Sequence, residues 1–207
     1  MDFHFTVNRV DIDSTECNDA ACSTLKALSQ TLEGLDYIGS TRVSNSTQLD
    51  IHSESPFVAR LKAGGWHVVE NPSPKLCGAD EHWGNPKADL LIHLDDRENQ
   101  KAVLEIERAN KKTVWFDFVK LWMFLESQDI GAGVLVCPSN YAHKSGVWNV
   151  FEEARRYKRL LARFARVPRD KLCAIGILGY TQFIQRDGDY RYWNNLEFEE
   201  AKRRARG

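Results

Sequence analysis

Two short segments of alternating apolar residues, 88–94 and 102–108, most constrain how this chain can fold. Alternation over so few residues is typical of strands, and the polar turn between the segments predicts a β-hairpin. Side chains two positions apart share a face of a strand, so Glu105 and Glu107 point the same way. Asp89 lies on the neighbouring strand. The hairpin therefore brings three acidic residues together on adjacent strands.

These three carboxylates, Asp89, Glu105 and Glu107, constrain the function as well as the fold. Carboxylates held close together repel one another unless a positive charge lies between them. A hard divalent cation such as Mg²⁺ prefers oxygen ligands of this kind, and Mn²⁺ is expected to substitute for it. Without a metal, the pKa values of the clustered carboxyls are expected to be raised.

The rest of the chain predicts an α/β protein with a mixed central sheet flanked by helices. Residues 40–50 are polar and indicate a loop or an exposed hairpin. The first part of the chain predicts an opening strand at about 3–7 and a helix with either Asp19 or Ser23 as its cap and Gly34 near its end, through the apolar positions Leu25, Leu28, Leu32 and Leu35. The other expected elements are a helix that begins at Ser53 or Ser55, strands at 66–69, 88–94 and 102–108, a helix at about 114–127 capped by Thr113, a buried strand at 131–138, a helix at about 146–166, a buried strand at 172–178 and a closing hairpin or helix.

The composition is that of one globular domain with a substantial core. The 207 residues carry a net charge of −1, so any attraction for nucleic acid must come from local groups of basic residues. Five scattered cysteines without a CxxC pair indicate free thiols in a reducing compartment. The first residues do not read as a secretory signal, and no apolar run is long enough for a membrane span. We therefore expect a cytoplasmic protein with no membrane partner.

The order of predicted elements between about 53 and 140 resembles the PD-(D/E)xK nuclease core. A helix and a strand precede the strand with Asp89; the strand with Glu105 and Glu107 follows, and then another helix and strand. The Glu-x-Glu strand, the Asn-Lys after it, the helix with Asp117 and the Gly-Ala-Gly-Val-Leu-Val strand are similar to type II restriction endonucleases of the BglII and BamHI type. In one departure, an alanine stands before the aspartate where the family has proline.

The resemblance implies a single domain, 1–207, with a restriction-endonuclease-like core at about 53–140. The N-terminal segment 1–52 and the C-terminal segment 141–207 are then additions to that core. It implies a Mg²⁺-dependent endodeoxyribonuclease that leaves 5′-phosphate ends on double-stranded DNA. A palindromic target implies a two-fold homodimer.

The resemblance also implies roles for the acidic residues. Asp89 and Glu105 are the expected metal ligands and, with Glu107, the expected catalytic set. Glu107 stands where most relatives have lysine, so we expect it to accept a proton from the attacking water or to complete a metal site. Either Glu54 or Glu70 is a further candidate metal ligand, and the alternative for each is a carboxylate on the protein surface.

Two groups of residues are candidate contacts to a phosphate backbone. One group directly follows the acidic strand, and the other lies on the basic face of the helix expected at about 146–166. The alternatives are a basic turn in the first group and, in the second, a solvated face on which Glu152 and Glu153 form salt bridges with Arg156. The candidates are Arg108, Asn110, Lys111, Lys112, Arg155 and Arg159.

Two functions of other kinds stay open beside the nuclease. The first is a catalytically inactive module with the nuclease fold that binds nucleic acid or a protein partner. The second is a metal-dependent hydrolase of another phosphoester. The residues predict no recognition sequence, no preference between DNA and RNA and no cleavage stagger.

Overall fold

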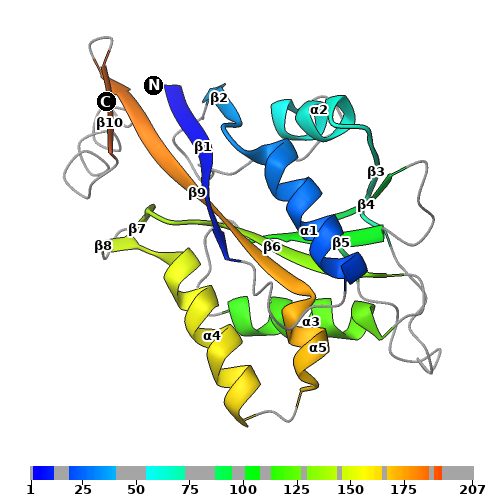
Figure 1. Ribbon diagram of the computed structural model, residues 1–207. Helices are drawn as coiled ribbons and strands as arrows, with labels where there is room; N and C mark the ends of the chain where they lie inside the picture. The colour runs from blue at the N-terminus through cyan, green and yellow to red at the C-terminus, as the bar shows by residue number, and fades with distance from the viewer. Residues whose placement is uncertain are drawn as a thin grey trace.

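A mixed β-sheet runs through the middle of the molecule, and helices cover both of its faces (Figure 1). The computed structural model describes residues 2–11, 19–40, 55–72, 87–94, 101–107, 113–126, 130–143, 146–164, 167–186 and 189–192. Five strands form the mixed part of the sheet, in the order β9-β6-β5-β4-β3, and β1, β2 and β10 extend it to eight. The expected α/β architecture with a mixed sheet between helices is therefore confirmed.

The strands that carry the acidic residues lie inside this sheet. β5 pairs antiparallel with β4 on one side and parallel with β6 on the other, so it has no free edge over its paired residues. The sheet strands are β1 (Asp2–Asp11), β2 (Asp36–Ser40), β3 (Trp66–Glu70), β4 (Leu90–Leu94), β5 (Lys101–Ile106), β6 (Ala132–Pro138), β9 (Ile175–Arg186) and β10 (Asp189–Tyr192), and a separate hairpin consists of β7 (Tyr141–His143) and β8 (Gly146–Trp148).

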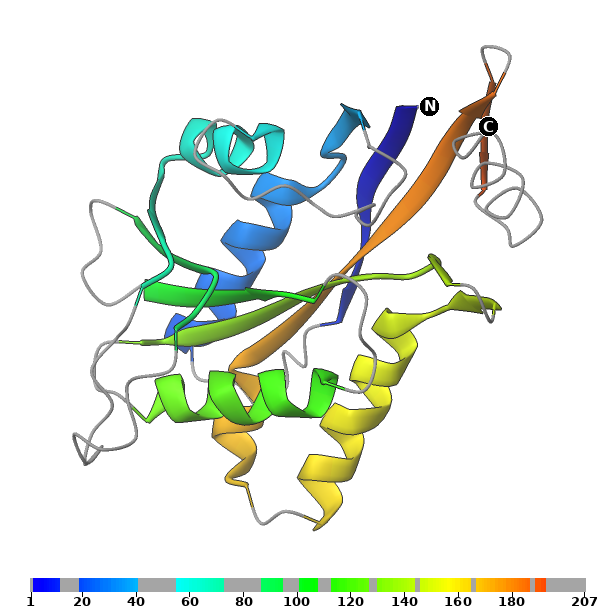
Figure 2. The ribbon, with the colours of Figure 1, turned by 180° about the vertical axis from the view of Figure 1, so that it is seen from behind.

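The helices form two layers, one on each face of the sheet (Figure 2). The first layer consists of α1 (Asp19–Leu32) and α2 (Pro56–Ala63), and the second of α3 (Val114–Leu125), α4 (Val150–Phe164) and α5 (Arg169–Cys173). Alternate side chains of each strand enter opposite cores, since Leu104 packs with the first layer and Val103 with the second. Glu105 follows the alternation of Val103 and therefore faces the layer that contains α3.

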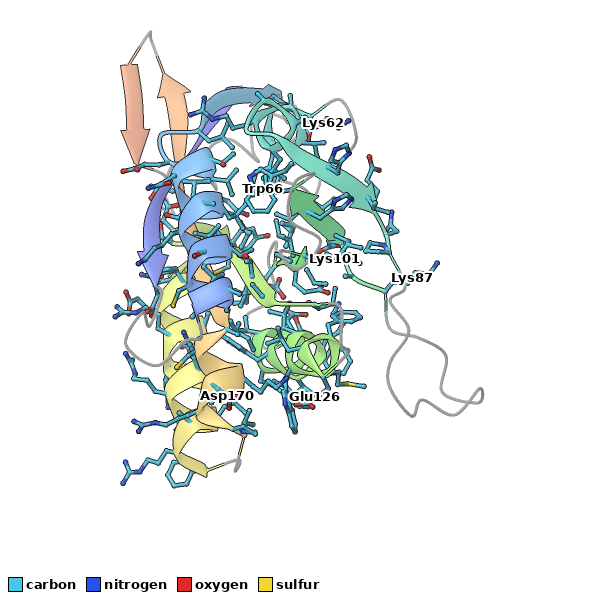
Figure 3. All side chains as sticks on the ribbon, turned by 45° about the vertical axis from the view of Figure 1, so that its right-hand side comes forward. Lys62, Trp66, Lys87, Lys101, Glu126 and Asp170 are labelled. Carbon is cyan, nitrogen blue, oxygen red and sulfur yellow. The ribbon has the colours of Figure 1, made fainter. Side chains whose placement is uncertain are left out.

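Polar contacts connect the first helix layer to the edge of the sheet. The indole of Trp66, labelled in Figure 3, donates a hydrogen bond to Thr31 Oγ1 of α1 over 3.0 Å. The guanidinium of Arg60 on α2 donates to the Thr31 carbonyl over 2.8 Å. Because Trp66 begins β3, these contacts link both helices to the strand next to β4.

Most of the expected elements are confirmed, and three of them have other boundaries than expected. The opening strand, expected at about 3–7, runs from Asp2 to Asp11. The helix expected from about 146 begins at Val150, because Asn149 Oδ1 accepts a hydrogen bond from the Glu152 amide over 3.0 Å and so caps the helix there. Residues 146–148 form β8 instead. The strand expected at 172–178 begins only at Ile175, after α5, and continues to residue 186 because β1 pairs along it.

Three further expectations have plain outcomes. The closing element that the described residues contain is a hairpin, formed by β9 and β10. The expected loop at 40–50 lies outside the described residues apart from Ser40, which ends β2. Within the described part of the chain, no helix is both long and apolar enough to cross a membrane.

Replacement of Ser55 by alanine is expected to destabilise the fold. Ser55 is buried, and its hydroxyl accepts a hydrogen bond from the Val58 amide over 3.2 Å at the start of α2. Loss of such an N-cap costs about 1 kcal/mol of unfolding free energy, measurable by urea denaturation. Ser55→Thr is the matched control, because threonine keeps an uncharged hydroxyl as the acceptor. Equal stability of Ser55→Ala and the wild type would contradict this account of the cap.

Candidate active site

Strand pairing places Asp89 beside the middle of β5. Leu90 pairs with Leu104 in the antiparallel register, so the residue before β4 lies level with Glu105. Asp89 Oδ2 accepts a hydrogen bond from the Ile106 amide over 2.7 Å. The predicted approach of Asp89 to the acidic strand is therefore confirmed, and one of its carboxylate oxygens is oriented by the backbone of that strand.

The backbone around Asp89 is held by the end of β3. The Asn71 amide donates to the Asp89 carbonyl over 2.9 Å, and the Ala88 amide donates to the Pro72 carbonyl over 3.0 Å. Asn71 has a φ of 48°, a left-handed conformation that asparagine tolerates better than most residues. These bonds continue the β3–β4 pairing past its last strand residue and fix the position of the aspartate.

Glu105 is an acidic side chain in a largely apolar interior. Its exposed fraction is 3%, and Lys120 Nζ lies 2.6 Å from its Oε2. Its other oxygen, Oε1, has no hydrogen-bond partner among the described residues. Burial raises the pKa of Glu105 from 4.5 to about 8, Lys120 lowers it in opposition, and the charges of Asp89 and Asp117 raise it further. The raised pKa expected for the acidic cluster is therefore found at Glu105.

Glu107 lies just beyond β5 on the same face as Glu105. It is also buried, and its amide donates to the Val136 carbonyl over 2.9 Å, which continues the pairing with β6. The Thr113 hydroxyl donates to Glu107 Oε2 over 2.7 Å. Thr113 is the N-cap residue of α3, as expected, but its side chain makes no capping hydrogen bond and its hydroxyl binds this carboxylate instead.

A fourth carboxyl, Asp117, reaches the same place from α3. The carboxyls of Asp117 and Glu107 share a hydrogen bond. Burial raises the pKa of Asp117 from 3.8 to about 7, and the charge of Glu107 and this hydrogen bond raise it further against the opposing charge of Lys120. A protonated Asp117 can therefore donate a hydrogen bond to Glu107.

The role of α3 was not foreseen beyond the inclusion of Asp117 in the family resemblance. Asp117 and Lys120 are the charged residues of an otherwise apolar twelve-residue helix. They are three positions apart and therefore lie on one side of it. In Figure 3, side chains of α3 and of the sheet fill the space between the helix and the sheet. Two charged residues on one side of an otherwise apolar helix are the sequence pattern from which Lys120 could have been predicted as a site residue.

The other predicted site residues are dispersed. Glu70 lies at the exposed end of β3. Arg156 Nη1 lies 4.0 Å from Glu153 Oε2, as the salt-bridge alternative expected, and Arg155 on the same helix, α4, is paired with Asp11 over 2.7 Å and with Glu152 over 3.4 Å. Arg159 is exposed on the same helix. The remaining candidates lie outside the described residues: Glu54, Arg108, Asn110, Lys111 and Lys112.

The donor set suits a hard cation only if other oxygens complete it. Within the described residues, no three His, Cys, Asp or Glu side chains are arranged to hold a metal ion by themselves. Mg²⁺ is commonly bound by one or two carboxylates, with waters and substrate phosphates as the remaining ligands. Asp89 and Glu105 meet that requirement, because they are adjacent and Glu105 Oε1 is buried without a hydrogen-bond partner among the described residues.

Comparison with known proteins indicates no function for this chain, so a function has to be argued from the geometry of the site. A scan against protein-family models finds no match to this chain, and a search of curated proteins finds none similar to it. The functional argument therefore depends on four carboxyls and one lysine at the contact between β5 and α3.

The stability of the protein is expected to fall between about pH 4.5 and pH 8. Because the pKa of Glu105 is raised in the folded state, its contribution is complete below 4.5 and is lost as the pH rises through about 8. Asp117 adds to the loss up to about pH 7. One pKa unit corresponds to about 1.4 kcal/mol, so the rise from 4.5 to about 8 sets an upper limit of about 5 kcal/mol on the loss for Glu105.

Glu105→Gln tests this pH dependence, because glutamine resembles the protonated carboxyl and does not titrate. Urea denaturation should give equal unfolding free energies for the variant and the wild type near pH 4.5, and a more stable variant at pH 8. Parallel curves across this range would contradict the raised pKa of Glu105.

Proposed function

We propose that this protein is a Mg²⁺-dependent endonuclease with a restriction-endonuclease-like core, and that it hydrolyses phosphodiester bonds of double-stranded DNA. The observation that carries the proposal is the buried carboxylate of Glu105, next to Asp89, with one oxygen that no described residue satisfies. A buried charged group that only stabilised the fold would be expected to have all its hydrogen bonds satisfied. An acidic site in a protein interior is typical of catalysis.

Asp89 and Glu105 would hold the metal ion, for which Mn²⁺ is expected to substitute. When bound, the ion supplies charge stabilisation for the phosphodiester and lowers the pKa of a water molecule. The chain supplies the geometry, because the backbone of β5 orients Asp89 and the surrounding apolar residues exclude bulk water from Glu105. Glu70 is exposed at the end of β3, so its position supports a role as a metal ligand less well than the buried position of Glu105 does.

Glu107 and Asp117 would accept the proton that the attacking water loses. The raised pKa of Asp117, about 7, keeps a proton on Asp117 under mild conditions, where its carboxyl is hydrogen-bonded to Glu107. Loss of that proton leaves a base close to its working pH, which is the condition for effective general base catalysis. The Thr113 hydroxyl holds Glu107 in place for this role.

The subclass we propose is a type II restriction endonuclease that acts as a homodimer on a palindromic site. The Glu105-x-Glu107 arrangement supports it, and the polar segment 108–112 directly follows Glu107 and would contact phosphates. A cytoplasmic location is part of the same proposal, supported by the buried, free thiol of Cys137 and by a sequence without a CxxC pair.

A second candidate is a non-catalytic module that binds nucleic acid. The contact of Lys120 with Glu105 favours it, because a lysine can neutralise this carboxylate without any metal. Such a module would bind DNA without a divalent ion and would leave the DNA uncut.

Cleavage of plasmid and genomic DNA in Mg²⁺ is the direct test. The wild type should cut, and Asp89→Asn and Glu105→Gln should each reduce the rate by about 100-fold or more, because each removes a ligand charge. Agarose gels would follow the loss of intact DNA. Glu126→Gln, which changes an exposed carboxyl at the end of α3, is the matched control and should cut at the wild-type rate. Equal cutting by all variants, or no cutting by the wild type, would contradict the proposal.

A further inference from the structure

Lys120 places a positive charge where the proposed metal site needs one. Its ammonium lies 2.6 Å from Glu105 Oε2, and the exposed fractions of the two side chains are 15% and 4%. Its charge also acts on Asp117, one turn earlier on α3. Helix packing therefore brings a lysine into an acidic site built mainly on two strands.

The position of this lysine conflicts with a metal ion at Glu105. An ammonium and a divalent cation that share one carboxylate repel each other strongly at such a short distance, above all where water is scarce. Glu105 Oε1 has no hydrogen-bond partner among the described residues, so the carboxylate keeps an oxygen for a second ligand while Lys120 holds Oε2. Full coordination by Glu105 then requires that the ammonium move away.

Lysine is suited to such a movement. Its charge is a compact point at the end of a flexible four-carbon chain, unlike the planar fork of arginine. The Lys120 side chain is partly exposed, whereas that of Glu105 is almost fully buried, so the lysine is the partner with a route toward solvent. A phosphodiester at the site would offer the released ammonium a new negative partner.

We propose that Lys120 is the resident counter-ion of Glu105, which a divalent cation must displace, and that the released ammonium then neutralises the phosphodiester being cut. The inference rests on the proposed nuclease function and deepens it. Lys120 is a positioning residue for Glu105 before the metal binds and contacts the substrate afterwards. The two roles predict opposite effects of removing its charge: tighter metal binding and slower cleavage.

Calcium affinity tests the first role without any catalysis. Isothermal titration at low salt would compare the wild type, Lys120→Gln and Lys120→Arg, with Asp89→Asn as a variant that lacks a ligand charge. Lys120→Gln should bind Ca²⁺ about 10-fold more tightly than the wild type, because glutamine can still donate to Glu105 but carries no charge. Lys120→Arg keeps the charge and should stay near the wild type. Asp89→Asn should bind more weakly.

Cleavage in Mg²⁺ tests the second role on the same proteins. Lys120→Gln should cut DNA about 100-fold more slowly than the wild type even when its metal site is saturated. Circular dichroism would check that each variant is folded, and Lys120→Met replaces the glutamine variant if that one is not. A lysine that served only the fold would not give tighter metal binding together with slower cutting.

The outcomes separate this inference from the function on which it rests. If the wild type binds Ca²⁺ and cuts DNA while the uncharged Lys120 variants bind Ca²⁺ no more tightly, the counter-ion role is wrong and the nuclease stands. If the uncharged variants bind more tightly but no protein cuts DNA, the displacement is supported and the nuclease proposal fails. If the wild type neither binds Ca²⁺ nor cuts, both are overturned.

Discussion

The burial of Glu105 is the constraint on which the rest of the site depends. β5 is paired on both sides and covered by α3, so a carboxyl at this position has little access to water. An apolar side chain of similar size would be expected to stabilise the sheet at least as well. Two features offset the cost of burying this carboxyl. Lys120 lies next to one of its oxygens, and its pKa is raised to about 8, which favours the uncharged form.

The same constraint explains why the acidic groups are arranged in two pairs. Asp89 and Glu105 lie side by side on neighbouring strands, where a shared cation would remove their repulsion. Glu107 and Asp117 share a hydrogen bond across the contact between the sheet and α3, where the raised pKa of Asp117 reduces the repulsion because Asp117 is protonated below about pH 7. One pair is therefore suited to binding an ion and the other to handling a proton.

The strand side of this site was predictable from local patterns, whereas the helix side was not. Alternation along 88–94 and 102–108 was enough to bring Asp89 level with the acidic strand, because strand faces and hairpin pairing are local properties. The approach of Lys120 to Glu105 depends on how α3 packs on the sheet, which no local pattern encodes. Thr113 shows the same limit, since its hydroxyl binds Glu107 rather than the helix end.

The errors in the element boundaries have a similar origin. β9 is longer than its apolar run because β1, from the far end of the chain, pairs along it. Residues 146–148 pair with β7 instead of joining the helix, because Asn149 caps the helix after them. Long-range pairing and a single cap thus decided what periodicity alone left ambiguous.

The most direct test of the central claim is a crystal structure of the metal-free protein and of the same crystals soaked in Mn²⁺, with anomalous scattering to locate the ion. The account predicts an ion bound to both Asp89 and Glu105 and a Lys120 side chain that has moved away from Glu105. A saturating soak that leaves Lys120 on Glu105, with no anomalous peak beside these carboxylates, would contradict it.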